Sequence, residues 1–240
     1  MKRIYFNILL IAILLITVSL NAQVKGLSAG FGGSMNYFQR VEKDAVLQHF
    51  SQVLPHFHLK LETPDLMRFV GQIQTNFYTK QIRLGYRYQL TSGGKVTEGF
   101  HHDYFSSDVV LSAMYNHRIN GTTRFRPRLG FFVSFNQYVG TTEYSGVSGF
   151  GSNSNIQAQY SFDIETDESP FFIYPGIFLG FSILKYSNRG RGYSLFTDFY
   201  FAPRNIFSNP FSYSLNGDLM ELQGKYHYLN LGLRMNLFRS

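Results

Sequence analysis

The segment His101-His102-Asp103, with Ser106 and Ser107 close behind it, contains the residue types of a base-activated nucleophile. In such a site a histidine removes the proton of a serine hydroxyl, and a carboxylate orients the imidazole. The candidate roles are Ser106 or Ser107 as nucleophile, His102 as base and Asp103 as the orienting group. Two adjacent histidines do not both point at one centre without distortion of the chain, so solvated loop side chains are the favoured interpretation.

A second histidine pair, His56 and His58, alternates earlier in the chain. If both histidine groups lie at the same rim of the fold, they could meet and bind a transition metal. The sequence has no Cys, no zinc signature, no phosphate-binding glycine motif and no carboxylate pair at the spacing that glycosidases use. It therefore predicts no metal and no cofactor, and it favours a non-enzymatic protein over an enzyme.

Charged residues recur at alternate positions of segments that have the pattern of strands, and we expect them on one face. Seven of them are basic and two are acidic, and the face is expected to line the inside of a barrel. Buried charges must be paired or hydrated, which favours a salt-bridged plug over a narrow, anion-preferring pore. The residues are Arg68, Arg83, Arg87, Arg124, Arg126, Arg128 and Arg234, with Asp108 and Asp198.

The strands that must position these residues are clearest at the C-terminal end. Apolar and polar residues alternate without a break over 226–238, with Leu231, Leu233 and Met235 on one face and Arg234 on the other. A period of two predicts a strand with one apolar and one polar face. Similar patterns predict seven more strands, and the full set is 25–38, 67–78, 81–90, 104–118, 123–138, 171–186, 192–202 and 226–238.

The connections between the predicted strands are alternately long and short. Long loops at one end of a barrel and tight turns at the other are typical of outer-membrane barrels. Short turns are predicted at Thr79-Lys80, around Asn120-Gly121 and over 187–191. Two long connections contain strand-like alternation of their own, at 56–61 and 156–164. A ten-stranded barrel is therefore an alternative to the preferred eight strands.

The N-terminal segment and the composition indicate export. Residues 1–22 join a basic start, Lys2 and Arg3, to an apolar run and have the pattern of a secretory signal peptide, which leaves 23–240 as the barrel domain. The chain has a net charge of +7. An exported protein seldom meets nucleic acid, so this excess is expected to meet lipid phosphates or sugar acids. Aromatic residues make up 18% of the chain, as a transmembrane barrel requires.

The N-terminal region and the last strand resemble the small outer-membrane beta-barrel domain family of Gram-negative bacteria. The matching features are the signal end Ala22-Gln23, the stretch Gly-Phe-Gly-Gly-Ser-Met-Asn at 30–36 and the alternating strand 229–238. The alternating strand pattern of the family extends over the whole mature chain, whereas similarity of the residues themselves is limited to its two ends. It implies a fold and a location, with assembly by the barrel assembly machinery. It implies no single activity, and no catalytic residue carries over.

Together these patterns predict an all-β, antiparallel up-and-down transmembrane β-barrel with a structural or binding role in the cell outer membrane. It is expected to be exported through the periplasm by a cleaved signal peptide. Its expected partners are outer-membrane lipids including lipopolysaccharide, the barrel assembly machinery and an extracellular ligand held by the long loops 139–170 and 203–224. The alternatives are a lipid A-modifying hydrolase that uses the His, Ser and Asp residues above, the anion-preferring pore, and a soluble periplasmic barrel with apolar residues inside.

Overall fold

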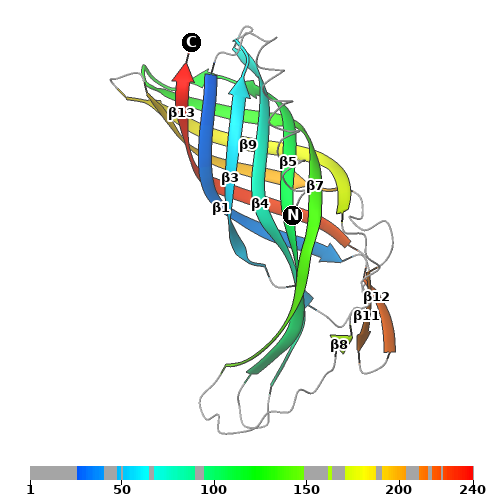
Figure 1. Cartoon of the computed structure of the whole chain (residues 1–240). Helices are drawn as coiled ribbons and strands as arrows, with labels where there is room; N and C mark the ends of the chain where they lie inside the picture. Colours follow the sequence, from blue (N-terminus) through cyan, green and yellow to red (C-terminus); the bar gives the residue numbers. More distant parts are fainter. Residues whose placement is uncertain are drawn as a thin grey trace.

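The computed structural model describes residues 26–40, 48–49, 51–64, 68–89, 95–148, 162–163, 171–187, 191–203, 211–215, 218–222 and 224–239. Within these residues, eight long strands form a closed antiparallel barrel (Figure 1). Each strand pairs with the next in chain order, and β1 pairs with β13 to close the cylinder. The predicted eight-stranded, all-β barrel is confirmed. Its strands are β1 (Gly26–Arg40), β3 (Val53–Glu62), β4 (Phe69–Gln89), β5 (Lys95–Tyr115), β7 (Thr123–Ser148), β9 (Phe171–Tyr186), β10 (Gly192–Phe201) and β13 (Gly224–Arg239).

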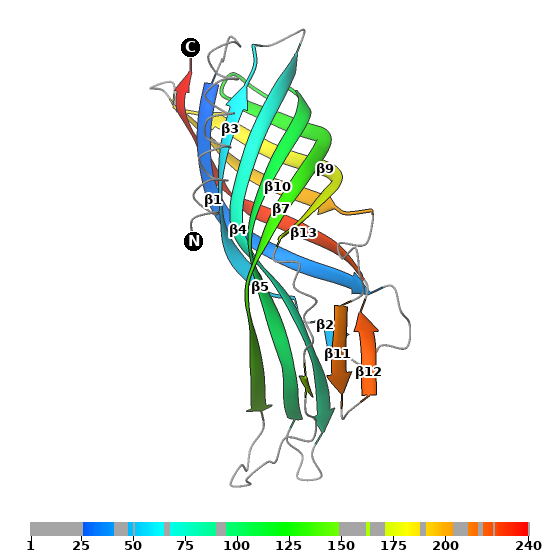
Figure 2. The same ribbon diagram turned by 45° about the vertical axis from the view of Figure 1, so that its right-hand side comes forward.

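Five short strands lie outside this set. Strand β2 (Gln48–His49) pairs with β4, and β6 (His117–Arg118) pairs with the start of β7. The other three, β8 (Phe162–Asp163), β11 (Phe211–Leu215) and β12 (Asp218–Leu222), form a separate sheet that lies apart from the barrel wall (Figure 2). The described residues contain no helix long and apolar enough to cross a membrane.

One predicted turn is wrong, because the predicted strands 67–78 and 81–90 are a single strand, β4. Thr79 pairs with Phe105 and Lys80 pairs with Tyr104 inside the sheet. Neither Thr nor Lys supplies the backbone conformation of a tight hairpin turn, so nothing at this position interrupts the strand. Even-numbered residues of β4 therefore point into the barrel both before and after this position. The residues after Lys80 consequently point to the face opposite to the predicted one.

The strand that restores the count to eight is β3, which contains the alternating segment 56–61; the preferred eight-strand prediction places this segment in a long connection. It pairs with β1 from Gly26 to Met35 and with β4 from Gln72 to Tyr78. The other strand-like segment, 156–164, is described only at Phe162–Asp163, which belongs to the small sheet.

The short turns gather at one end of the barrel. Asn120 shapes the turn before β7, because its Oδ1 accepts the N–H groups of Thr122 at 3.0 Å and Thr123 at 2.8 Å. The predicted turn at 187–191 is also present: the N–H of Ser187 donates to the carbonyl of Arg191 at 2.8 Å. Both predictions are confirmed.

Arg68 occupies the remaining short turn, between β3 and β4, and has a positive φ of 81°. Its side chain is exposed, and its Nη1 donates to the hydroxyl of Tyr115 at 3.4 Å. This hydrogen bond raises the pKa of the guanidinium. The prediction that Arg68 points into the barrel is wrong, because β4 begins only at Phe69.

Three strands continue past the closed part of the barrel. In the described residues the pairing of β7 with β9 ends at Gln137, whereas β4, β5 and β7 continue together over 79–89, 95–103 and 140–148. We call this ribbon the extension. At its base Val139 is an extra residue in β7, a bulge that increases the local bend. The extension curves away from the barrel at the end opposite the C-terminus (Figures 1 and 2).

The two faces of the barrel wall differ in polarity. On the outside, the side chains of Leu231 and Leu233 are 53% and 55% exposed. On the inside, the side chain of Arg234, the residue after Leu233, is 2% exposed. A closed barrel with an apolar outer wall satisfies its backbone hydrogen bonds internally and presents hydrocarbon to lipid. This is the predicted integral outer-membrane barrel, and the soluble alternative requires the reverse arrangement. The most exposed outward residues include Phe31, Leu111, Leu129, Phe131, Ile173, Ile183, Leu195 and Leu237.

Candidate functional site

The centre of the barrel interior contains a buried charge cluster. Arg128 forms an ion pair with Asp198, and both side chains are fully buried. Gln74 joins the cluster, because its Oε1 accepts N–H groups of Arg128 and Arg234 at 3.2 Å each. Arg234 also lies 3.8 Å from the second carboxylate oxygen of Asp198. Two guanidinium groups therefore share one carboxylate, with Gln74 as a neutral bridge.

A second cluster lies nearer the short turns, where β3 ends. Glu62 accepts from the Nζ of Lys60 and lies 3.2 Å from Nη1 of Arg126. Gln72 donates to the same carboxylate at 3.2 Å. This cluster also pairs two cations with a single carboxylate.

The third cluster surrounds Lys80, which lies on the inner face close to the base of the extension. Its Nζ donates to Ser134 at 2.6 Å, Asn136 at 2.8 Å and Tyr174 at 2.6 Å, and Asp108 is 3.8 Å away. Tyrosine rings surround the ammonium at 4.7 to 5.3 Å from ring centroid to Nζ, a range in which cation–π attraction operates. The rings belong to Tyr78, Tyr174, Tyr226 and Tyr228.

Aromatic rings occupy much of the remaining interior. Tyr200 and Tyr228 stack with their centroids 4.2 Å apart, and the ring of Phe132 packs nearly perpendicular to both. The hydroxyl of Tyr228 donates to Asp108 at 2.5 Å. An eight-stranded barrel is just wide enough for its own side chains to fill. Paired charges and packed rings therefore form an internal plug, which argues against the pore.

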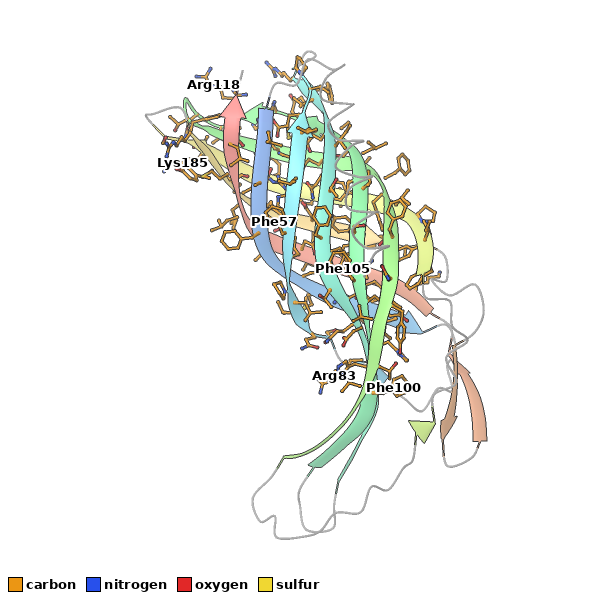
Figure 3. All side chains as sticks on the ribbon, in the orientation of Figure 1. Phe57, Arg83, Phe100, Phe105, Arg118 and Lys185 are labelled. Atoms are coloured by element: carbon orange, nitrogen blue, oxygen red, sulfur yellow. The ribbon has the colours of Figure 1, made fainter. Side chains whose placement is uncertain are left out.

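The structure places most, but not all, of the predicted interior residues inside. Arg126, Arg128, Arg234, Asp108 and Asp198 are buried there. Arg124 lies at the short-turn end over the ring of Tyr186, with 5.5 Å from its Cζ to the centroid. Arg83 instead lies on the outward side of β4, at the base of the extension (Figure 3), because the turn at Thr79-Lys80 does not exist. Arg87 follows at the same parity, but its side chain lies outside the described residues.

Sequence reasoning missed Lys60, Glu62 and Lys80. Among the described interior residues, five buried cations face three carboxylates, in place of the expected seven and two. Lys60 and Glu62 continue the alternation of His56 and His58, so recognition of that segment as a strand could have found them. Lys80 falls in the predicted Thr79-Lys80 turn, so the sequence does not predict that its side chain lies inside the barrel.

The hydrolase candidates do not form a catalytic arrangement. His102 and Asp103 are neighbours on strand β5, so their side chains point to opposite faces. Asp103 lies 3.5 Å from His101, whereas His102 is hydrogen-bonded to the hydroxyl of Thr141 at 2.5 Å. Burial, together with a smaller effect of the neighbouring His101, lowers the pKa of His102 to about 4.

The two candidate serines lie away from these histidines. Ser106 is fully buried, and its Oγ donates to Asn136 at 2.8 Å. Ser107 is on the other face of the same strand, level with Phe77 and Phe135. No nucleophile, base and orienting carboxylate therefore converge, which argues against the hydrolase.

His56 and His58 lie inside the barrel, not at a rim loop. Their rings stack with centroids 5.6 Å apart, and Phe196 contacts both edge-on. Nε of Arg234 donates to Nε2 of His58 at 2.7 Å. His56 is level with Tyr78, four positions before the partner of His102 on β4, so the two groups do not meet. In the part of the chain that the structure describes, no three His, Asp or Glu side chains could hold a metal ion.

The extension places basic residues of β4 and β5 at positions of the same parity. Arg83 lies directly opposite His101, and Arg87 and Lys95 occupy further positions of this parity along the ribbon. We call these four residues the basic face. Asp103, at the base and paired with His101, is the one carboxylate at this parity in the described parts of β4 and β5.

Neither a protein-family model nor a curated protein matches the chain. Several solved outer-membrane proteins align with it. OprG from Pseudomonas aeruginosa is 12% identical with a TM-score of 0.46, over 91% of this chain and 99% of its own. Neisserial surface protein A is 10% identical with a TM-score of 0.42, over 88% and 97%. Ail from Yersinia pestis, in complex with the heparin analogue sucrose octasulfate, is 9% identical with a TM-score of 0.36, over 87% and 96%. At these identities the likeness concerns the fold alone.

Proposed function

We propose that this barrel binds an anionic polysaccharide at the cell surface through the basic face of its extension. The observation that carries the proposal is the separation between a plugged barrel and a ribbon that projects beyond it. The interior charges are paired among themselves, so they are not available to a passing solute. The basic face, by contrast, belongs to strands that have left the barrel wall.

The charge pattern of the extension supports an anionic ligand. Arg83 and His101 are cross-strand neighbours at the base of the extension, and Arg87 lies four residues beyond Arg83 at the same parity of β4. A repeating polyanion, with acidic or sulfated sugars, presents charges at regular intervals to such a row. Because guanidinium groups bind carboxylate or sulfate oxygens in a bidentate manner, Arg83 and Arg87 are the expected anchors.

The sequence pattern supports three further parts of the proposal. Residues 1–22 are proposed to be a cleaved signal peptide that delivers the chain through the periplasm; they lie outside the described residues. The barrel assembly machinery is proposed to insert the barrel, and lipids including lipopolysaccharide are proposed to surround its apolar wall. The loop residues Phe207, Phe211 and Tyr213, which were expected to pack on the rim or contact a partner, lie outside the residues whose side chains are described.

The experiment uses the purified full-length protein in lipid nanodiscs, with immobilised heparin as the probe and uncharged dextran as the reference polymer. The double variant Arg83→Gln/Arg87→Gln should weaken heparin binding roughly tenfold, equivalent to about 1.4 kcal/mol. Its matched control is Lys185→Gln/Arg191→Gln, which removes two charges at the opposite end of the barrel, where Lys185 is labelled in Figure 3. In nanodiscs both ends are accessible, so the comparison separates the basic face from net charge.

If both double variants reduce heparin binding equally, the net charge of the protein, not the basic face, is responsible for the binding. Equal binding of heparin and dextran, or no binding of heparin by the unaltered protein, would also overturn the proposed ligand class. The proposal is supported if the unaltered protein binds heparin, added salt weakens that binding, and Arg83→Gln/Arg87→Gln weakens it while the control variant does not.

A further inference from the structure

A groove of about 270 Å³ is hollowed into the outer wall of the barrel, across β1, β10 and β13. It lies toward the end from which the extension projects, because its residues are near the end of β1 and β10 and the start of β13. Its outward-facing side chains are mostly apolar and belong to the wall that contacts lipid. They are Met35, Tyr37, Phe199, Phe201, His227 and Leu229.

The rings of this groove form a continuous platform. The rings of Phe199 and Phe201 stack with centroids 6.4 Å apart, and Phe201 lies 6.0 Å from the ring of His227. Tyr37 stacks on the other side of His227 at 6.4 Å. Aromatic rings at the end of a transmembrane barrel belong to the interfacial girdle, where lipid headgroups meet acyl chains.

Cationic and donor groups border the groove on the side of the extension. Lys225 precedes His227 by two residues on β13 and has the same outward parity, level with Gln39 of β1. Nδ1 of His227 accepts the N–H of Ala202 at 3.3 Å. Because that nitrogen acts as an acceptor, the neutral ring carries its proton on Nε2, which is then a donor. An ammonium and an imidazole N–H therefore lie directly above an apolar, ring-lined surface.

A lipid is the occupant that fits this position. The groove faces the bilayer, so its neighbour is an acyl chain rather than a folded partner. A positive charge one step above the acyl region attracts the phosphate of that lipid, and each Lys or Arg near an anionic membrane surface adds about 1 kcal/mol of attraction. The outer leaflet at the extension end of an outer-membrane barrel consists mainly of phosphorylated glycolipid, which supplies several acyl chains below its phosphates.

We propose that this groove is a specific site for a phosphorylated, multiply acylated glycolipid of the outer leaflet, with an acyl chain against Phe199, Phe201 and Leu229 and a phosphate at Lys225 and His227. The inference rests on the orientation of the barrel in the proposed function, not on the polysaccharide ligand. It assigns the barrel wall a role separate from that of the extension.

The test is native mass spectrometry of the full-length protein in detergent, titrated with three probes: bisphosphorylated lipid A, its fully dephosphorylated form and phosphatidylglycerol. The unaltered protein should retain bisphosphorylated lipid A best. Lys225→Gln should weaken that binding about fivefold, and Phe201→Ala should weaken binding of both lipid A forms. The matched controls are Lys185→Gln, an outward lysine at the opposite rim, and Phe131→Ala, an exposed ring outside the groove.

Equal effects of Lys225→Gln and Lys185→Gln would overturn the phosphate site. Equal retention of phosphatidylglycerol and lipid A would show a general anionic annulus and overturn the glycolipid assignment. Folding is checked for every variant by the change in gel mobility between unheated and heated samples, and a variant that fails this check is replaced by Lys225→Met or Phe201→Leu. Heparin binding is measured on the same samples, so failure of the extension proposal is distinguishable from failure of this one.

Discussion

Arg128 on β7 and Asp198 on β10 form a fully buried ion pair, although β9 lies between their strands in the sheet. The pair therefore reaches across the curved interior of the barrel instead of along one hairpin. Closure of the cylinder brings the two side chains together, and Arg234 of β13 completes the group from the next strand. The interior of this barrel is held by contacts between strands that are not neighbours.

Replacement of Asp198 by Ala should destabilise the barrel by about 3–5 kcal/mol, because two guanidinium groups then remain buried without their carboxylate. The measurement is guanidinium-induced unfolding of the protein in lipid vesicles. Asp103→Ala is the control, since the partly exposed pair of Asp103 and His101 should contribute less than about 1 kcal/mol. Similar losses for both variants would contradict the assignment of the plug as the main stabilising feature.

The seam that closes the barrel depends on a pair of glycines. Gly32 on β1 lies opposite Gly232 on β13, and a Cβ built on Gly232 would meet the carbonyl oxygen of Phe31 at 2.2 Å. Because the obstacle is backbone, Gly232→Ala should prevent β1 and β13 from pairing closely. We expect little or no heat-modifiable barrel on unheated gels. Gly140→Ala, where a Cβ meets nothing within 4 Å, should fold normally, and failure of both would point to a general sensitivity to glycine loss.

The placement of the apolar wall in lipid is tested by a charge at two depths of one strand. Leu231 lies near the middle of β13 and Leu237 near its end, and both side chains point outward. Arginine at the midplane of a transmembrane barrel costs about 2–4 kcal/mol, whereas near the interface the cost is about 0–1 kcal/mol. Refolding titrations into lipid vesicles should therefore show a much larger loss for Leu231→Arg than for Leu237→Arg. Equal effects would contradict the membrane depth inferred for β13.

Acid should loosen the extension through His102, which lies outside the closed barrel. Its pKa is about 4 in the folded protein and near 6.5 when the chain opens, so the open state binds the proton first as the pH falls. The stability of the extension should thus decrease between pH 6.5 and 4, by about 2 kcal/mol on going from pH 7 to 5. Hydrogen exchange of the extension amides at the two pH values measures this change. His102→Phe should abolish the pH response, and an unchanged response would assign it to another group.

The alternation of the sequence was sufficient to assign most of the barrel wall. In the middle of β7 and β13 the apolar residues that alternate with polar ones point to lipid, because a strand exposes successive side chains to opposite faces. This reasoning placed Arg126, Arg128 and Arg234 inside and Leu231 and Leu233 outside. The short turn at Asn120-Gly121 was predictable for a local reason, since the side chain of Asn120 forms the turn by itself.

Only the tertiary structure shows where along the strands the alternation of apolar and polar residues stops predicting which side chains face outward. The extension lies beyond the closed part of the barrel, and there an apolar residue no longer marks the outer face. Ile82 lies at the inner parity, whereas Arg83 lies at the outer one. A two-residue turn would have reversed the parity, and only the pairing of Lys80 with Tyr104 shows that the strand continues. Likewise, alternation says which residues enter the barrel but not which ones meet. Pairs such as Arg128 and Asp198 depend on the curvature and closure of the whole cylinder, which no local segment contains.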